Sequence, residues 1–337
     1  MNSETPGFSL GSLLRRPETG SFLGLAVVFI FFMVFGGENF ASATGAASWL
    51  NVAASLGIVA LPMGLLMIAG ELDISIGSLI PAGSMTIAII SGHFGAPILV
   101  GIVAALALGL AVGFINGQLV IRTGVPSFIV TLGTLFTVAG ITLGLSVILT
   151  GTTSVALKAG VEAKFMLGHF IAGIYQVIIF WWVAAALIAG FVLHFSKYGN
   201  WIFAMGGDKE SARNAGIPTK RLTITLFVLS AVFASFVGMC QAILFNSAQV
   251  SGGMGFIFNA IVSIVVGGVL LTGGFGSVLG IFFGTLTFAV VSQGIYFINI
   301  DRNWSNLIIG AVLLLAVLMN NTFRQLAVSY TGAKKRN

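Results

Sequence analysis

The chain has 337 residues, of which 57% are hydrophobic and only 7% are charged, with a formal net charge of +6. Because a soluble domain carries about 25% charged residues, this composition excludes a soluble globular protein and is typical of a membrane protein. The apolar runs are continuous rather than alternating, which excludes a membrane barrel of strands, and the basic residues lie between the runs, which argues against a nucleic-acid-binding surface.

The apolar runs predict an all-α membrane protein with about ten helices that cross the lipid bilayer. A helix needs about 20 predominantly apolar residues to cross, and the runs supply enough length for ten such segments. The predicted spans, in chain order, are residues 21–37, 48–69, 76–91, 97–120, 125–149, 172–194, 222–245, 256–272, 277–298 and 304–321.

These spans form one predicted transmembrane domain over residues 21–321, between an N-terminal segment 1–20 and a C-terminal tail 322–337. With ten spans, twelve Lys and Arg residues fall on the side of the termini and three on the other. This bias predicts that both termini are cytoplasmic. A cleavable signal peptide is the alternative, because residues 41–43 resemble a cleavage site. Glu38 precedes that site, which favours an uncleaved first span.

Two carboxylates, Glu71 and Asp73, lie between the second and third predicted spans. A charge at the centre of a spanning helix costs about 2.5 to 3.5 kcal/mol, so these groups need partners, water or an interfacial position. One interpretation is a short cytoplasmic turn, in which Asp73 or Ser75 caps the third helix. The other is a broken helix whose polar groups line a path through the membrane or form its inner gate.

Amide side chains inside the predicted spans also have two interpretations. They can join helices through hydrogen bonds, worth about 0.6 kcal/mol on average, or they can bind a passing hydroxylated solute. We expect weak polarity along the path rather than a pocket of aromatic residues and carboxylates. The candidate path or gate residues are Glu71, Asp73, Ser75, Asn116, Asn259 and Gln293, and the other amides are Asn51, Gln118 and Gln241.

Only two predicted connections are long, residues 150–171 and 196–221, and neither is large enough for a domain. The second, which we place on the cytoplasmic side, contains a predicted helix of about two turns. Asp208 is a good N-cap, Gly216 can end the helix in the left-handed conformation, and Pro218 prevents its continuation. Because so short a helix is marginal in water, it must pack on its own spans or on another chain.

Motifs for nucleotide and metal binding are absent from the sequence. No G-x-x-x-x-G-K-[ST], H-E-x-x-H or C-x-x-C pattern occurs, so we expect this chain to bind no ATP through a Walker A loop, no metal and no cofactor. No Ser/His or Asp/Asp constellation stands out, which argues against an intramembrane enzyme. The single cysteine, Cys240, excludes an intramolecular disulfide.

Four segments together resemble the permease subunits of ribose-type sugar ABC importers. Residues 206–217 resemble the coupling-helix pattern G-G-x-x-x-x-A-R-x-x-G-I of that family, and residues 70–78 resemble its signature G-x-[IL]-D-[LIV]-S-[VIF]-G-S. Residues 116–134, with Asn-Gly followed by Thr-Leu-Gly-Thr, and the glycine cluster at 267–277 are similar to two further family segments. Glu71 is a departure, because family members often carry glycine there.

This resemblance implies a type II-like permease fold in the bacterial inner membrane, with two permease subunits per complex, either a homodimer or a pair of similar paralogues. A separate ATPase would bind ATP and Mg, and a periplasmic or surface binding protein would deliver a monosaccharide or related sugar alcohol. The resemblance also implies that the predicted helix docks on the ATPase. The implied coupling residues are Gly206, Gly207, Asp208, Glu210, Ala212, Arg213 and Gly216.

The competing function is a self-sufficient secondary transporter, in which Glu71 and Asp73 bind the coupling ion. Such transporters place ionisable groups at membrane depth, and these two are the only acids near the interior of a predicted span. Uptake that persists without ATP and collapses with the proton or sodium gradient would favour this alternative.

Overall fold

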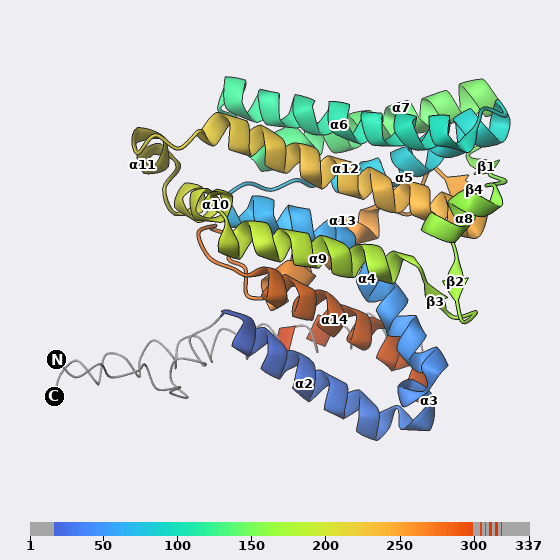
Figure 1. The fold of residues 1–337 in the computed structure, drawn as a ribbon, viewed down its shortest axis with the longest axis horizontal. Helices are drawn as coiled ribbons and strands as arrows, with labels where there is room; N and C mark the ends of the chain where they lie inside the picture. Colours follow the sequence, from blue (N-terminus) through green and yellow to red (C-terminus); the bar gives the residue numbers. More distant parts are fainter. Residues whose placement is uncertain are drawn as a thin grey trace.

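The computed structural model describes residues 17–298 and seven further residues between 304 and 318. Residues 1–16, the tail 322–337 and the tenth predicted span as a continuous element therefore lie outside the described part. Within that part, the chain forms a bundle of helices that run between two ends (Figure 1). The short helix α11 (Lys209–Asn214) lies at one end, which we call the loop end, and the strands lie at the other, the strand end.

Eight helical segments of the described chain are long and apolar enough to cross a membrane. The prediction of a helical membrane protein is thus confirmed, whereas the count of ten spans stays a prediction. The long segments are α2 (Pro17–Phe35), α4 (Ala43–Ile68), α5 (Ile76–Ile87) with the π-helical turn Ala88–His93, α6 (Ile98–Thr123), α7 (Ser127–Thr150), α9 (Ile178–Phe195), α12 (Thr219–Phe245), and α14 (Val278–Gly294) with the 3-10 turn Ile295–Phe297. The shorter helices are α3 (Gly37–Ala41), α8 (Val161–Leu167), α10 (Lys197–Gly207), α11 and α13 (Met254–Val266).

Two antiparallel strand pairs close the strand end. Strand β1 (Ser154–Ala156) pairs with β4 (Ser247–Gln249), and Val155 lies opposite Ala248. Strand β2 (Phe170–Ile171) pairs with β3 (Tyr175–Gln176). Because this second pair forms a tight hairpin, α9 begins at Ile178, later than the predicted span boundary at residue 172.

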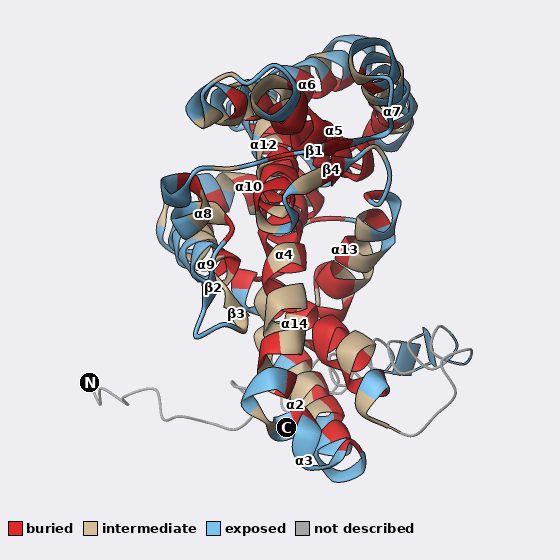
Figure 2. Cartoon of the chain, turned by 90° about the vertical axis from the view of Figure 1, so that its right-hand side faces the viewer, coloured by how far each residue is buried: buried red, intermediate tan, exposed pale blue. Residues whose placement is uncertain are grey.

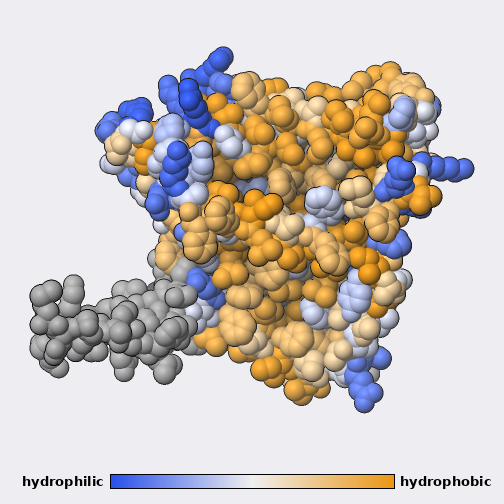
Figure 3. Space-filling model, viewed as in Figure 1, coloured by the Kyte–Doolittle hydropathy of each residue, from blue (hydrophilic) through white to orange (hydrophobic). Residues whose placement is uncertain are grey.

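The core of the bundle is built around α4. In its most apolar window 83% of the residues are buried, against 17% for α7 and for α9, and Figure 2 places α4 in the middle of the bundle. The outer helices expose apolar side chains, and Figure 3 shows a broad hydrophobic surface with hydrophilic residues gathered toward the two ends. An apolar outer surface is what a helix facing lipid requires, because lipid tails replace water as the solvent.

Close packing of α6 on α12 depends on three glycines spaced four residues apart. A Cβ at Gly109, Gly113 or Gly117 would lie within 2.9 Å of the α12 backbone, at Ala231 O, Phe227 O and Ile224 Cα respectively. Small residues at such spacing allow two helix backbones to approach, which drives helix association in lipid. This contact fixes α6, and with it Asn116, against the centre of the bundle.

The predicted span at residues 256–272 is wrong as a continuous helix. Helix α13 ends at Val266, and residues 267–277 follow in an irregular conformation that reaches the loop end. The cause is the glycine cluster, in which Gly268, Gly273 and Gly274 have φ values of +86°, +82° and +74°. These left-handed conformations are compatible with glycine and incompatible with a continuing helix.

The long connection at the loop end contains a helix that the sequence patterns did not predict. Helix α10 begins at Lys197, and Ser196 is its N-cap, because the Ser196 side chain accepts a hydrogen bond from the Tyr198 N–H. The Lys197 ammonium lies 5.5 Å from the ring centroid of Trp201 and 5.6 Å from that of Tyr198. Aromatic and basic side chains together are typical of a helix at a membrane interface, and they were the sequence signal for this element.

Candidate functional site

Helix α11 forms as the capping residues predict. The Asp208 carboxylate accepts a hydrogen bond from the Ser211 N–H at 2.5 Å, and this bond holds the pKa of Asp208 below its usual range. A lowered pKa means that the cap is present at neutral pH and is lost as the pH falls through that lowered value. At the other end Gly216 has a φ of +84°, and the Ile217 N–H donates to the Ala212 carbonyl, which closes a Schellman motif.

Two charged side chains of α11, those of Glu210 and Arg213, are exposed. Glu210 and Arg213 face each other with 3.5 Å between Oε1 and Nη2, and their side chains are 76% and 60% exposed. Ala212, on the opposite side of the helix, is buried. An exposed pair of this kind contributes little to folding, so these charges are available to a partner.

Helix α10, which directly precedes α11, packs against two other segments through a contact of four glycines. We call this contact the glycine junction; its residues are Gly70, Gly206, Gly273 and Gly274. The Gly274 N–H donates to the Ile68 carbonyl at 2.8 Å, which joins the irregular segment 267–277 to the end of α4. A Cβ at Gly206 would overlap both the Ile68 carbonyl oxygen and the Gly274 nitrogen, whereas a Cβ at Gly207 would meet nothing within 4 Å. The three segments therefore meet backbone to backbone directly before α11.

Glu71 lies beside this junction, and its carboxylate forms an ion pair with the Lys209 ammonium of α11. The Glu71 side chain is 10% exposed and that of Lys209 is 43% exposed. The pair joins residues 138 positions apart in the sequence, and no sequence pattern indicated Lys209. It links the segment between α4 and α5 directly to α11.

We expect the Glu71–Lys209 pair to couple these two segments by no more than about 1 kcal/mol, because Lys209 is largely solvated and salt screens exposed pairs. A double-mutant cycle of Glu71→Gln and Lys209→Gln measures this coupling from the unfolding free energies of the purified chain. A coupling that is zero at low ionic strength would contradict the contact.

Asp73 lies deeper, in a buried network of hydrogen bonds at the start of α5. Its Oδ1 accepts from the Ser75 N–H at 3.0 Å and from the Ser75 hydroxyl at 2.5 Å. The Asn116 amide donates to Ser75 Oγ at 3.0 Å, and the Thr134 hydroxyl donates to Asn116 Oδ1 at 2.6 Å. Asp73, Ser75 and Asn116 are each fully buried. Three of the predicted path residues thus meet, and Thr134 joins them.

The depth of this network in the bundle bears on the two interpretations of the segment, both of which stay predictions. Asn116 is seven residues before the end of α6 at Thr123, which is about 10 Å along the helix. The segment between α4 and α5 runs back into the bundle before α5 begins (Figure 1). Ser75 does not cap α5 with its side chain, because its hydroxyl is donated to Asp73. The break is therefore buried at Asp73 and Ser75, whereas Glu71 pairs with Lys209 at the loop end.

Helix α7 supplies hydrogen-bond acceptors for two backbone N–H groups of this segment. The Leu72 N–H donates to Ser127 Oγ at 3.0 Å, and the Ile74 N–H donates to Thr131 Oγ1 at 3.2 Å. Irregular backbone at membrane depth persists only where other parts of the protein supply such partners. The Asp73 Oδ2 and Ser230 Oγ atoms have no hydrogen-bond partner among the described residues, although Ser230 lies beside the carboxyl group.

Asn259 lies elsewhere, in a cavity nearer the strand end. This cavity has an empty volume of about 610 Å³ and is lined by residues of α4, α12, α13 and α14. Gln293 lines none of the cavities described here. Phe245, Phe256 and Phe288 line the Asn259 cavity and no carboxylate does, and the expectation of weak polarity along the path stays a prediction.

Comparison with known proteins identifies relatives over most of the chain. A family model described as "Branched-chain amino acid transport system / permease component" matches residues 45–317. The chain is 28% identical over 94% of its length to the fructose import permease protein FrcC of Rhizobium meliloti, of which 88% is covered. It is 30% identical over 78% of its length to the ribose import permease protein RbsC of Escherichia coli K12, of which 81% is covered. No solved structure matches the chain.

Proposed function

This chain belongs to the permease family of ABC importers that includes the ribose and fructose import permeases, and from that premise we propose that it translocates a monosaccharide or related sugar alcohol with energy from a separate ATPase. The family membership and the buried, broken segment before α5 support this proposal. In this reading the chain has no ATP site of its own, and ATP and Mg bind to the partner.

The ATPase docks on α11 in this proposal, and the loop end is cytoplasmic. Three observations support the docking site: α11 is capped at both ends, it exposes Glu210 and Arg213, and it is joined to the transmembrane helices by the glycine junction and by Glu71. A movement of α11 imposed by the ATPase would reach the end of α4 and segment 267–277 through backbone contacts, which transmit displacement without flexible side chains.

The break between α4 and α5 then acts as the inner gate. The observation that supports this role is a fully buried carboxyl group with one oxygen unpartnered in the described chain, next to a hydroxyl that is also unpartnered. Because buried polar groups are costly to leave unpaired, a movement of the helices around Asp73 and Ser230 would change the free energy of this segment. Asn259 and Gln293 are proposed to face the path in the rest of the bundle.

The complete importer contains two permease subunits, identical or paralogous, two ATPase subunits and a periplasmic or surface binding protein that delivers the solute. Gentle detergent purification of the tagged chain from its native cell, with mass spectrometry of stoichiometric partners, tests this composition. An ATPase with Walker motifs that co-purifies supports the proposal. A chain that emerges alone, under conditions that preserve known complexes, contradicts it and leaves ion coupling at Glu71 and Asp73 as the alternative.

Replacing Glu210 and Arg213 together by alanine is expected to uncouple ATP hydrolysis from transport, because the pair is exposed and contributes little to the fold. The reconstituted complex should hydrolyse ATP while sugar uptake falls by about tenfold or more, which corresponds to a loss of about 1.4 kcal/mol in coupling.

The matched control is Arg122→Ala, which removes an exposed charge at the loop end from the last turn of α6. Its uptake should equal that of the unaltered complex. Normal uptake by the Glu210/Arg213 double variant would refute the docking role of α11.

A further inference from the structure

Two cavities nearer the strand end meet at Gln241 and Phe245 on α12. Each has an empty volume of about 610 to 620 Å³, part of which is open to solvent. The outer cavity is lined by Ile80, Pro81, Ser84, Gln241, Phe245, Ser247, Gln249, Ser251, Gly252 and Gly253. The inner cavity is lined by Asn51, Val52, Ser55, Leu56, Gln176, Gln241, Leu244, Phe245, Phe256, Asn259 and Phe288.

The chemistry of the two linings is uniform. Neither contains a charged residue, and both combine amide or hydroxyl side chains with apolar ones. Amides and hydroxyls each donate and accept hydrogen bonds, so they match the hydroxyl groups of a neutral solute. A charged solute would lose its hydration on entering these cavities and would find no opposite charge there, and this desolvation costs free energy. The lining therefore favours an uncharged, polyhydroxylated molecule.

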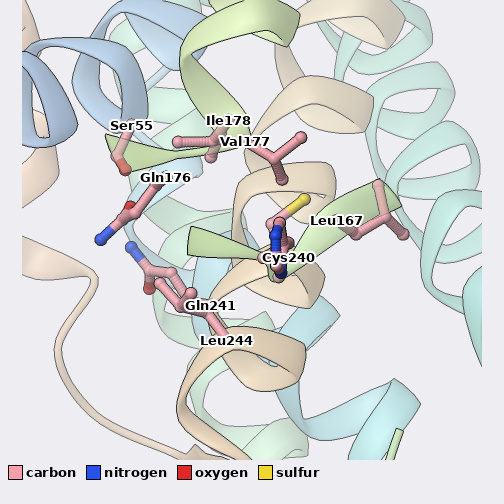
Figure 4. Close-up of a pocket in the computed structure, with 10 residues that line it drawn as sticks. Ser55, Leu167, Gln176, Val177, Ile178, Cys240, Gln241 and Leu244 are labelled. Atoms are coloured by element: carbon pink, nitrogen blue, oxygen red, sulfur yellow. The ribbon is translucent and has the colours of Figure 1, made fainter. Parts of the chain in front are cut away.

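Several of these amides are not used to hold the helices together. The side-chain amides of Gln176, Gln241 and Asn259 make no hydrogen bond within residues 17–298. Figure 4 shows the Gln176 and Gln241 amide groups approaching each other in a third, smaller cavity that both residues also line. Asn51 differs, because its side chain donates to the Ile174 carbonyl and accepts from the Gln176 N–H, both at 2.9 Å. Asn51 is a structural amide, and the other three are free to bind a ligand.

We propose that the cavities around Gln241 are an intramembrane binding site for an uncharged polyhydroxylated solute, in which the amides of Gln241, Gln176 and Asn259 bind its hydroxyl groups. This inference rests on the proposed transport function and locates the solute within the chain. Phe245, Phe256 and Phe288 supply the apolar surface against which the carbon-bound hydrogens of a sugar ring pack. Gln241 is the central residue because it lines all three cavities.

The position of Gln241 also connects this site to the loop end. Helix α12 begins at Thr219, five residues after α11 ends, and continues unbroken to Phe245. A rigid helix carries a displacement of its first turn to its last. A movement of α11 would therefore alter the shape of the cavity at Gln241 and change its affinity for the solute.

The test uses a cysteine reporter that leaves all the amides intact. Cys240, the single native cysteine, is replaced by alanine, and Val52→Cys places a reporter thiol in the inner cavity. The complete complex in lipid nanodiscs reacts with a water-soluble, uncharged methanethiosulfonate reagent, with and without D-ribose, D-fructose, D-galactose or xylitol. We expect at least one of these to slow the reaction, by about threefold at a concentration of twice its Kd.

Two controls make the result specific. Phe258→Cys is the neighbour of Asn259, is 71% exposed and lines neither cavity, so its reaction rate should be independent of sugar. Adding Gln241→Ala to the Val52→Cys chain should abolish protection while the unprotected rate stays the same, which shows that the cavity is preserved. D-ribose 5-phosphate should give no protection.

A Val52→Cys thiol that does not react, that none of the four neutral probes protects, or that is protected equally after Gln241→Ala overturns the proposal. Each of these outcomes leaves the proposed transport function to be judged separately, by co-purification of the ATPase and by ATP-driven uptake. If the ATPase does not co-purify and uptake is not driven by ATP, the proposed transport function itself fails, and with it the premise of the binding site.

Discussion

Replacing Gly206 by alanine is expected to destabilise the chain and to abolish ATP-driven transport, whereas the same change at Gly207 has little effect on either. The added Cβ at Gly206 overlaps the Ile68 carbonyl oxygen and the Gly274 nitrogen, both of which are backbone atoms. Backbone cannot move aside as a flexible side chain does. The Gly274 to Ile68 hydrogen bond must break, or α10 must shift away from α4.

The expected cost at Gly206 is about 1 to 3 kcal/mol, the usual range for overpacking a close contact. At Gly207 the added methyl meets open space, and the change stays within about 1 kcal/mol because alanine is the better helix former. Unfolding can be measured with a thiol-reactive dye, because the single cysteine, Cys240, is buried and reacts only when the chain unfolds around it. Equal unfolding temperatures and equal uptake for the two variants would contradict the role of the glycine junction.

The sequence patterns predicted α11 because its determinants are local. Asp208, Gly216 and Pro218 act on backbone groups within a few residues of themselves, so their effect can be read without knowing the fold. The long apolar helices were predicted for the same reason, since length and composition decide whether a segment can cross a bilayer. The glycines that end α13 were visible in the sequence, but the apolar residues around them favoured a continuous span.

The contacts that give the site its shape are not local. Lys209 pairs with Glu71, and the Asn116 amide meets Ser75 only because α6 packs on α12 and α5. The cavities around Gln241 are lined by α4, α5, α12, α13 and α14 together with Gln176 and residues 247–253, and no spacing rule brings these residues together. Gln241 was visible as an amide in a span. Only the absence of a hydrogen-bond partner in the described structure separates it from Asn51, whose side chain bonds to the β2–β3 hairpin.

Asp73→Asn is expected to leave the chain folded and to change the rate of transport, which would assign the buried carboxylate to the gate. Asparagine retains the Oδ1 acceptor for the Ser75 N–H and hydroxyl, so the turn before α5 is kept. It replaces Oδ2, which has no partner in the described chain, with a donor that faces the Ser230 hydroxyl.

Because a buried hydrogen bond that is gained or lost changes the free energy of a conformation by about 1 to 3 kcal/mol, Asp73→Asn shifts the balance between gate conformations by roughly 5- to 150-fold. Uptake by the reconstituted complex should fall while the amount of folded protein is unchanged.

Glu71→Gln makes the same chemical change two residues away, at a partly solvated ion pair, and should reduce uptake only slightly. Unchanged transport by Asp73→Asn at unchanged expression would leave Asp73 a purely structural residue and place the inner gate elsewhere in the bundle. Asp73→Ala, which strands the Ser75 N–H and hydroxyl as well, should lower both stability and transport, so the contrast between asparagine and alanine separates gating from folding.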